Sequence, residues 1–255
     1  MANQPLISVT CNTRNRVVWL KQALESVLRQ RDVELELIVI DDHSTDETKG
    51  YLDYLANSDS RVRVITNPEQ LGIAASANRS LNRARGQYIA KIDDDDYWID
   101  DAKLKKQIAF LEEHPDYVVV GTGVRIVNEQ GRPLRDLVRK ETDREIRAGM
   151  LAANRITNST AVFRRDAALA IGGYDPRYRV ASDYEFYLKL GRVGKMHNLP
   201  DICVAYRVSS GAITQTLSRA KRFALHREYL KNYRNDYPYY YRALFIRTLR
   251  YLLGQ

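Results

Sequence analysis

QYIAKIDDDD, at residues 87–96, joins a short apolar segment to four consecutive aspartates, Asp93 to Asp96. Tyr88 to Ile92 is rich in β-branched and aromatic residues, which predicts a buried strand. Aspartates at the end of such a strand place several carboxylates at one edge of a sheet, where open α/β sheets bind ligands. Carboxylates this close repel one another, and with no His or Cys beside them the cation that suits them is Mg²⁺ or Mn²⁺. The alternative is a solvated acidic turn.

Strand and helix patterns alternate on both sides of this segment. Strands are predicted at 6–10, 35–40, 61–66, 117–127, 157–164 and 202–208, and helices at 16–29, 72–85, 101–113, 165–171 and 182–190. Ser44, with Glu47 three residues later, predicts a capping box at the start of one more helix. The stretch 132–149 is polar with weak periodicity, which favours a loop with a short helix. This alternation predicts an α/β fold with a mostly parallel central sheet flanked by helices.

The composition is that of one folded domain with a small appendage. The chain has 255 residues, of which 44% are hydrophobic and 28% charged. Cys11 and Cys203 form no disulfide framework and lack metal-site spacing. No apolar run approaches the roughly 18 residues of a membrane span, and no charged-then-apolar leader precedes the first strand. We therefore expect a cytoplasmic protein, and its C-terminal segment is a candidate for placing it at the inner face of the cell membrane.

The positive charge of the chain is concentrated at its C-terminal end. From Leu217 onward nine Lys and Arg residues face only Glu228 and Asp236, a net charge of +7 out of the +8 of the whole chain. The predicted division is a body at 1–215 and a basic, Tyr-rich helical extension at 216–255, broken near Pro238. Basic helices with an aromatic and apolar face lie on anionic membranes. Packing against the body or against a second subunit in a homo-oligomer is the alternative, and no recognition module points to nucleic acid.

Six motifs in this order resemble the family 2 glycosyltransferases, which have the GT-A fold. The resemblance covers about residues 5 to 210. It rests on LISVTCNTRNR (6–16) with LESVLRQ (24–30), LIVIDDHSTD (37–46), NPEQLG (67–72) with Ala77-Asn78, GQYIAKIDDDD (86–96), GGYD (172–175) and ASDYE (181–185). Two positions depart from the family pattern: Cys11 stands where a Pro is usual, and Ser182 where a Glu precedes the catalytic Asp.

The resemblance implies an enzyme. It would be a metal-dependent, inverting transferase that moves a sugar from a nucleotide diphosphate donor, UDP-sugar above all, to a glycan or lipid-linked acceptor in surface polysaccharide biosynthesis. The alternatives are a dTDP- or GDP-sugar donor, or a non-catalytic protein that binds sugar nucleotides or membrane glycans.

Residues at two strand ends are the candidate donor contacts. The loop after the first strand offers Thr10, Asn12 and Arg14, and the second strand ends in Asp41 and Asp42. An aspartate can accept a hydrogen bond from the imide N–H of uracil. The resemblance assigns this contact to Asp42 or Asp41, with Asp42 preferred, although both could instead open the next helix against its dipole. Further donor candidates are Asn78, Arg79 and Arg207.

The resemblance also divides the aspartate run into roles. Asp93-x-Asp95 matches the metal-binding DXD motif of the family, and Asp95 is the predicted ligand of Mn²⁺ or Mg²⁺. Asp94 would face the ribose, with Asp93 and Asp96 in support. A haloacid-dehalogenase-type phosphatase also has Asp-x-Asp at a strand end, but it requires a Thr two residues later, where Tyr97 stands. Because the excess positive charge lies in the extension, a metal is the predicted partner of these carboxylates.

Asp183 aligns with the general base of the family. It lies near the start of a predicted helix, behind the break at Gly172-Gly173. In an inverting displacement it would take the proton of the acceptor hydroxyl as the oxygen attacks the anomeric carbon. The alternative is that Asp183 caps the helix. Glu185 is the second candidate for the base.

Overall fold

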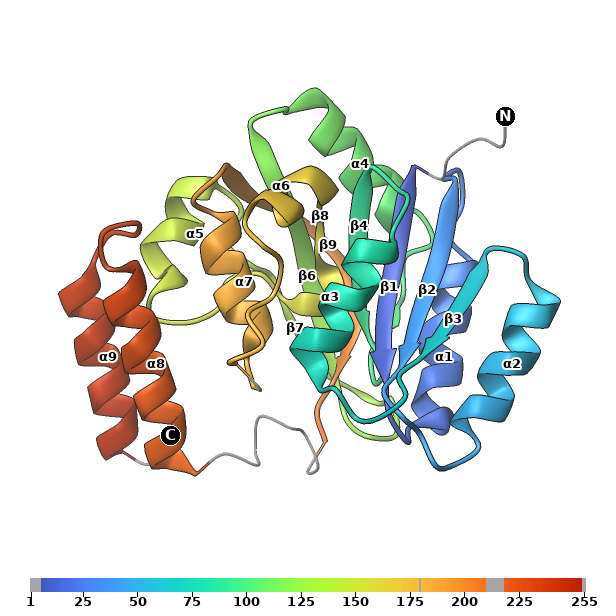
Figure 1. Ribbon diagram of the computed structural model, residues 1–255. Coiled ribbons are helices and arrows are strands. Elements are labelled where there is room, and N and C mark those ends of the chain that lie inside the picture. The colour runs from blue at the N-terminus through green and yellow to red at the C-terminus, as the bar shows by residue number, and fades with distance from the viewer. Residues whose placement is uncertain (1–5, 179, 210–217, 254–255) are drawn as a thin grey trace.

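The computed structural model describes residues 6–178, 180–209 and 218–253. In this part of the chain nine strands form one sheet: β1 (Ile7–Thr13), β2 (Leu35–Asp41), β3 (Val62–Thr66), β4 (Tyr88–Asp93), β5 (Tyr97–Trp98), β6 (Tyr117–Val127), β7 (Pro133–Leu137), β8 (Val162–Arg164) and β9 (Lys195–Arg207). Their order is β3-β2-β1-β4-β8-β6-β9-β5, and β7 pairs with β6 (Figure 1).

The N-terminal half of the sheet is parallel, as predicted. β1 pairs in parallel with β2 and β4, and the register sets Thr13 opposite Asp41 and Asn12 opposite Asp93. The ends of the three strands therefore meet at one edge of the sheet. The C-terminal half is mixed, because β8 runs antiparallel to both β4 and β6. The predicted α/β fold around a central sheet is confirmed, and its parallel pairs are those among β1 to β4 and that of β6 with β9.

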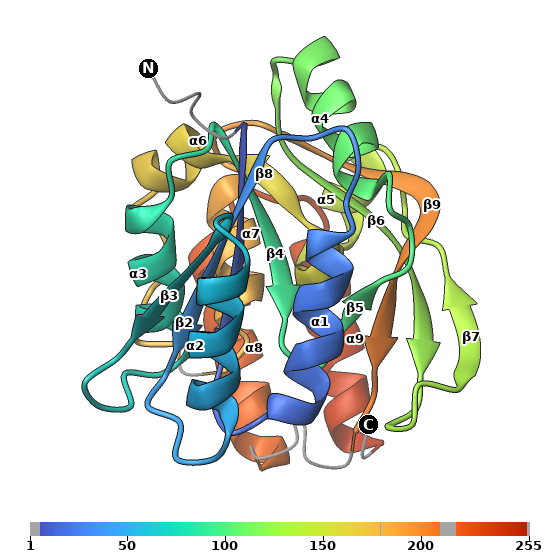
Figure 2. The same ribbon diagram turned by 90° about the vertical axis from the view of Figure 1, so that its right-hand side faces the viewer.

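Two hydrophobic cores cover the two faces of the sheet. The helices are α1 (Val17–Leu28), α2 (Thr48–Ser58), α3 (Ile73–Arg83), α4 (Lys103–Glu113), α5 (Asp143–Met150), α6 (Arg165–Ala170), α7 (Ser182–Leu190), α8 (Arg219–Tyr233) and α9 (Tyr240–Leu252). Alternate residues of β2 enter opposite cores, Leu37 on the side of α1, α2 and α4 and Ile38 on the side of α3 and α7 (Figure 2). This period-2 burial on both sides explains why β2 is apolar throughout.

Three local predictions were wrong. In the stretch 132–149 the predicted short helix is present as α5, which a capping box of Thr142 with Glu145 opens, but the segment predicted as a loop contains the strand β7. Ser44 does not cap α2, because its Oγ accepts from the backbone N–H of Asn15 at 3.0 Å. The predicted strand 157–164 begins only at Val162, after a 3₁₀ turn at Asn158–Thr160. This turn matters for the site, because it brings two polar side chains to the aspartates.

The extension packs against the body. α8 and α9 lie side by side as an antiparallel pair beyond α7 (Figure 1). Three tyrosines point inward and donate from their hydroxyls to α7 or its preceding residue: Tyr229 to the carbonyl of Ala181, Tyr233 to Glu185, and Tyr237 to the carbonyl of Leu188. The predicted boundary at 215/216 lies outside the described residues. In the described ranges no helix combines the length and the hydropathy that crossing a membrane requires.

Candidate active site

The aspartate run turns away from the sheet at the end of β4. Asp93 Oδ1 accepts a hydrogen bond from Asn158 Nδ2 at 2.6 Å. Asp96 is buried and accepts from Ser159 Oγ at 2.5 Å and from the backbone N–H of Arg207 at 2.8 Å. The 3₁₀ turn therefore holds Asp93 and Asp96, the two ends of the run. The two middle residues, Asp94 and Asp95, have a different partner.

The guanidinium of Arg16, which had no predicted role, lies against the carboxylates of Asp94 and Asp95. Arg16 Nη1 is 2.5 Å from Asp95 Oδ2 and 3.4 Å from Asp94 Oδ1. Arg16 follows the end of β1, so the same parallel register that gathers the strand ends brings it here. The expectation that no positive charge of the body neutralises the aspartates was therefore wrong. The position of Arg16, three residues beyond the end of β1, was the feature of the sequence that could have indicated this contact.

Burial makes Asp93 and Asp94 weaker acids than exposed aspartates. It raises the pKa of Asp93 to about 6, with Asp95 and Asp183 adding to the effect. It also raises the pKa of Asp94 to about 7, against the opposing effect of Arg16. Such a cluster favours a bound cation, because a cation stabilises the ionised carboxylates.

The donor set fits a divalent cation that is shared with a ligand. Its side-chain donors are carboxylate oxygens, which suit Mg²⁺ or Mn²⁺. Within the described ranges, no three His, Cys, Asp or Glu side chains gather closely enough to hold a metal by themselves. Mg²⁺ in proteins is commonly held by one or two carboxylates together with substrate phosphates and water. The arrangement around Asp95 is of this open kind.

Asp183 reaches the same region from α7. Its Oδ2 accepts from Asn154 Nδ2 at 3.1 Å, and burial raises its pKa. The N-cap position of α7 is Ala181, in the left-handed region at φ 56°, with no side-chain capping bond. Asp183 is therefore not the N-cap residue of α7; it lies in the first turn, where its carboxylate also interacts with the backbone N–H groups of Asp183 and Tyr184.

Lys91 is a second positive charge beneath the site. It lies two residues before Asp93 on the same face of β4, and its buried ammonium is 5.8 Å from the ring centroid of Tyr174. Burial lowers its pKa, while Asp93 and Asp183 raise it. Lys91 therefore lies in the field of both carboxylates. From the sequence, Lys91 was assigned to the strand Tyr88 to Ile92 and given no role at the site.

The two aspartates that end β2 differ in a way that reverses the predicted preference. Both oxygens of Asp42 are occupied, by Asn67 Nδ2 at 2.7 Å and by the backbone N–H groups of Leu71 and Gly72 at 2.8 and 2.9 Å. Asp42 thus ties the loop before α3 to the sheet. Asp41 Oδ1 accepts from the N–H of Ser44, whereas its buried Oδ2 has no hydrogen-bond partner among the described residues. The structure therefore favours Asp41 over Asp42 as the acceptor for a ligand.

Two other donor candidates act as structural clamps. Arg207 donates from Nε to the carbonyl of Asp95 at 2.8 Å, from Nη1 to the carbonyl of Glu129 at 2.6 Å, and from Nη2 to Gln22 at 2.8 Å. Its guanidinium positions the aspartate run instead of facing a phosphate. Asn78 exchanges two 2.7 Å hydrogen bonds with the backbone of Tyr174. Both side chains are thus engaged by the protein itself, and their contact with a donor stays a prediction.

The remaining predicted residues divide between the site and the interior. Thr10 is buried within β1, and its Oγ1 donates to the carbonyl of Ala90 at 3.4 Å. Glu185 points away from the site and accepts from Tyr233 Oη at 2.5 Å, which removes it as the second base.

Three further predicted residues lie near the strand ends. Arg79 bonds to Asn67 and to the carbonyl of Thr66. Asn12 lies at the strand end with a buried Oδ1 that has no partner among the described residues, and Arg14 is exposed beside it.

The break before α7 permits a test by two matched substitutions. Gly172 and Gly173 both have positive φ, at 77° and 66°. A Cβ at Gly172 meets nothing within 4 Å, whereas one at Gly173 would overlap Oδ1 of Asn78, which its two hydrogen bonds hold in place. Gly172→Ala is expected to lower the free energy of unfolding by about 1 kcal/mol, and Gly173→Ala by about 3 kcal/mol or more. Urea unfolding measures the difference, and equal losses would contradict the clamp assigned to Asn78.

Comparison with known proteins places the chain in context. A family model described as Glycosyl transferase family 2 matches residues 8–172. TuaG of Bacillus subtilis, whose name assigns it to teichuronic acid biosynthesis as a glycosyltransferase, is 36% identical over 131 residues, which are 51% of this chain and 51% of TuaG. The chain covers 58 to 67% of the length of the first curated relatives that it matches.

Two solved structures share the fold. S. aureus TarS in complex with UDP-GlcNAc superposes with a TM-score of 0.72 at 22% identity, over 89% of this chain and 67% of that one. The mannosyltransferase PcManGT of Pyrobaculum calidifontis, in complex with GDP-Man and Mn²⁺, superposes with a TM-score of 0.71 at 18% identity, over 98% of this chain and 70% of that one. At these identities the likeness concerns the fold.

Proposed function

This chain belongs to glycosyl transferase family 2 and has the predicted GT-A fold, and we propose that it is a metal-dependent inverting transferase that takes a sugar from a UDP-sugar. The proposed acceptor is a glycan or lipid-linked saccharide of a surface polysaccharide. One observation carries the proposal: the register of β1, β2 and β4 gathers Asp41 and Asp93 at one sheet edge, and Asp183 lies in the field of Asp93. The teichuronic acid assignment of TuaG and the UDP-GlcNAc bound by TarS support this choice of acceptor and donor.

Asp41 is proposed to read the base of the donor. Its buried Oδ2 has no hydrogen-bond partner among the described residues, and uracil offers an imide N–H to such an acceptor. Asn12 and Arg14 extend the same edge toward the nucleotide. Asp42 holds the neighbouring loop in place.

Asp41→Ala is expected to weaken UDP binding by about 10- to 100-fold, the range for a lost hydrogen bond to a charged group. Asp42→Ala is the matched control. It removes an acceptor from two backbone N–H groups, so we expect it to lower the free energy of unfolding by about 2 to 4 kcal/mol. Calorimetric titration of UDP, with urea unfolding in parallel, separates the two effects. Unchanged UDP affinity in Asp41→Ala would refute the assignment.

Asp95 is proposed to hold Mn²⁺ or Mg²⁺ together with the phosphate oxygens of the donor, with Asp93 in support and Asp94 at the ribose. When bound, the metal supplies Lewis-acid neutralisation of the leaving diphosphate. Arg16 places a fixed positive charge at the same point, which keeps Asp94 and Asp95 together in the free protein. The Mn²⁺ in PcManGT supports a divalent cation in a protein of this fold.

Asp183 is proposed to take the proton of the acceptor hydroxyl. Asn154 orients its carboxylate, and the raised pKa makes it a better base than an exposed aspartate. The positive charge of Lys91 opposes this rise. On the other side of α7, the basic extension is proposed to contact an anionic membrane, where a lipid-linked acceptor would lie.

A donor screen tests the proposed function. The purified chain is incubated with UDP-, dTDP- and GDP-sugars in Mn²⁺, and release of the nucleoside diphosphate is measured. We expect hydrolysis or transfer with a UDP-sugar above the other donors. If the chain binds a nucleotide sugar but releases no nucleoside diphosphate, with or without added glycan acceptor, the non-catalytic alternative is favoured.

A further inference from the structure

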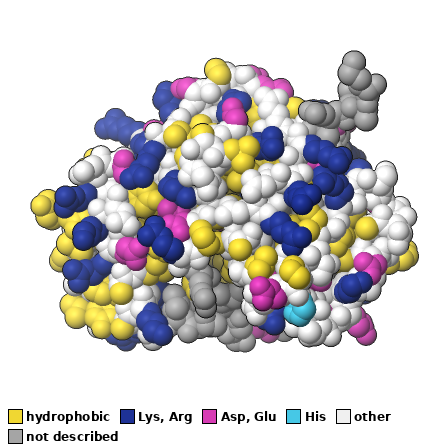
Figure 3. All heavy atoms as spheres, in the orientation of Figure 1, with side chains coloured by type: hydrophobic (Ala, Val, Ile, Leu, Met, Phe, Trp, Pro, Cys, Tyr) yellow, Lys and Arg dark blue, Asp and Glu magenta, His cyan; other side chains and the backbone are white. Residues whose placement is uncertain are grey.

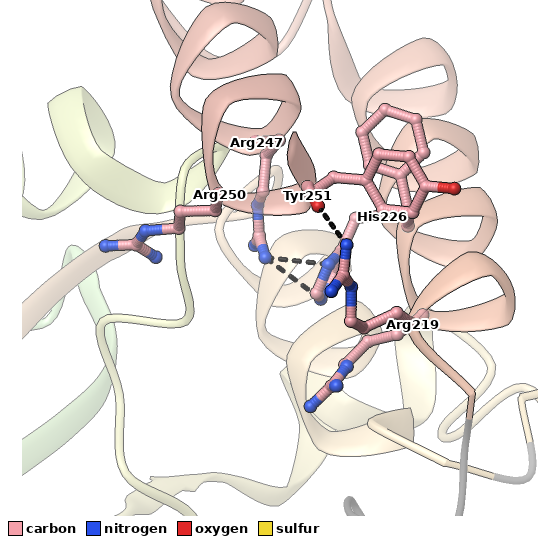
Figure 4. Close-up of a pocket in the computed structure, with 7 residues that line it drawn as sticks. Arg219, His226, Arg247, Arg250 and Tyr251 are labelled. Atoms are coloured by element: carbon pink, nitrogen blue, oxygen red, sulfur yellow. Dashed lines mark hydrogen bonds between the residues drawn. The ribbon is translucent and has the colours of Figure 1, made fainter. Parts of the chain in front are cut away.

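A basic cavity lies between the two helices of the extension, away from the candidate active site. It has a volume of about 190 Å³ and is lined by Arg219, Arg222 and His226 of α8 and by Arg247 and Arg250 of α9. Figure 4 shows Arg219, His226 and Arg247 facing one another between the helices, with Arg250 reaching outward beside them. No acidic side chain lines the cavity in the described part of the chain.

The two acidic residues of this segment are occupied elsewhere. Glu228 accepts from the hydroxyl of Tyr178 at 2.7 Å, and Asp236 pairs with Arg192 at 2.6 Å. The arginines of the cavity therefore repel one another without a carboxylate to offset the repulsion. This charge arrangement favours an anion supplied from outside.

Arg247 offers that anion a buried donor. The residue is only 9% exposed, and its Nε has no hydrogen-bond partner among the described residues. Its Nη1 lies 2.7 Å from Nδ1 of His226. Burial, together with Arg247, Arg222 and Arg250, lowers the pKa of His226 to about 3, so the imidazole is neutral and accepts from Arg247. The guanidinium is thus held in position with donor capacity left over.

The basic residues of α8 also oppose the local preference of a helix. The N-terminal turn of a helix favours acidic side chains, because its free N–H groups carry positive charge. The first turn of α8 has no acidic residue and instead begins with Arg219, followed by Lys221 and Arg222. Arg219 is stabilised from the other helix, since it donates to the carbonyl of Tyr251 at 2.7 Å. Positive charge is therefore concentrated at this end against local helix stability.

An apolar stripe runs beside the cavity along the outer face of α9. Tyr241 is 82% exposed, Phe245 67% and Leu252 71%. Their spacing puts them on one side of the helix, with Leu249 between them. In Figure 3 the end of the molecule formed by α8 and α9 shows hydrophobic side chains with Lys and Arg among them. An exposed apolar face next to a basic pocket is the pattern of a surface that lies on anionic lipid.

We propose that the cavity between α8 and α9 binds the phosphate group of an anionic membrane lipid while the stripe on α9 enters the lipid interface. This gives the membrane contact of the proposed function its residues and its ligand chemistry, and it does not depend on the identity of the sugar donor. The arginines supply bidentate donors for phosphate oxygens. The apolar side chains select a lipid over a free phosphate.

Flotation with vesicles tests the proposal on the full chain. Vesicles of phosphatidylcholine alone are compared with vesicles that also contain phosphatidylglycerol. We expect binding to the second kind only. Arg222→Ala combined with Arg250→Ala should weaken it by about 30-fold, since each surface Lys or Arg near an anionic membrane contributes on the order of 5-fold. Arg29→Ala combined with Arg31→Ala removes the same charge from exposed positions at the far end of α1 and should have little effect.

A second variant separates lipid from free phosphate. Phe245→Ser is expected to reduce vesicle binding and to leave calorimetric titration with inorganic phosphate or glycerol phosphate unchanged. Equal binding to both kinds of vesicle, equal losses in the two arginine pairs, or binding of soluble phosphate without vesicle binding would each overturn the proposal. Donor hydrolysis is measured in solution in parallel. A vesicle-binding failure with intact hydrolysis therefore counts against the lipid site alone, whereas loss of hydrolysis counts against the proposed transferase.

Discussion

Replacing Asp183 with asparagine is expected to lower kcat by about 10²- to 10⁴-fold, the usual contribution of a general base, while donor affinity stays the same. Asparagine keeps the size of the side chain and its contact with Asn154. It cannot accept the proton of the acceptor hydroxyl. Single-turnover transfer together with calorimetric titration of the donor measures the two quantities separately.

Glu185→Gln is the matched control on the same helix. Its carboxylate faces Tyr233 in the core between α7 and α8, so we expect kcat to change little and any effect to appear in stability. Turnover at the normal rate in Asp183→Asn, or an equal loss in both variants, would show that another group is the base.

The pH dependence follows from the same residue. Burial raises the pKa of Asp183, and a general base must be ionised to act. The rate of the wild-type protein should therefore fall as the pH drops through this raised value, at a higher pH than an exposed aspartate would require. The residual rate of Asp183→Asn should not show this acid limb.

Asp95→Ala is the second large effect. We expect Mn²⁺ to tighten UDP binding to the wild-type protein, and we expect the alanine variant to lose that gain and about 10²- to 10³-fold in turnover, which is the scale of Lewis-acid stabilisation. Of the four aspartates, Asp95 has the shortest ion pair with Arg16, at 2.5 Å between Oδ2 and Nη1. This carboxylate is therefore already in contact with a positive charge in the free protein. Calorimetric titration of UDP with and without Mn²⁺ gives a readout besides activity.

Arg16→Gln is the control for the metal response. It removes the charge beside Asp95 without removing a carboxylate, so the increase in UDP affinity caused by Mn²⁺ should persist. If Asp95→Ala still responded to Mn²⁺ as the wild-type protein does, the assignment of Asp95 would fail. A response lost in Arg16→Gln alone would assign the effect to the arginine.

The extension shows how one composition separates into different surfaces. The sequence pattern groups the tyrosines with the apolar residues as one face. In the structure Tyr229, Tyr233 and Tyr237 are buried against α7, whereas Tyr241 is exposed. Packing against the body is therefore real, and it leaves the other side of α9 uncovered. The membrane contact stays a prediction, now confined to α9 and to the cavity beside it.

The strands of the nucleotide half, the strand ends that carry Asp41 and Asp93, and the helix from Ser182 that carries Asp183 could all be predicted from the sequence. These features follow from periodicity over a few neighbouring residues, and parallel strands bring their ends to the same edge. Boundaries failed where the signal was polar, as in β7 and the 3₁₀ turn at Asn158.

Contacts between segments far apart in the sequence determine which polar groups are already hydrogen-bonded and which can still bind a ligand. Asp42 loses its capacity to donors 25 to 30 residues away, Asn78 to Tyr174 across 96 positions, and Arg207 to Asp95 across 112. Arg16 gains its role from a contact 79 positions distant. A local pattern carries no information about such partners, because hydrogen-bond saturation and burial arise only when distant segments pack together. The side chains that could act at the site were readable in the sequence, and the fold determined which of them are left to act.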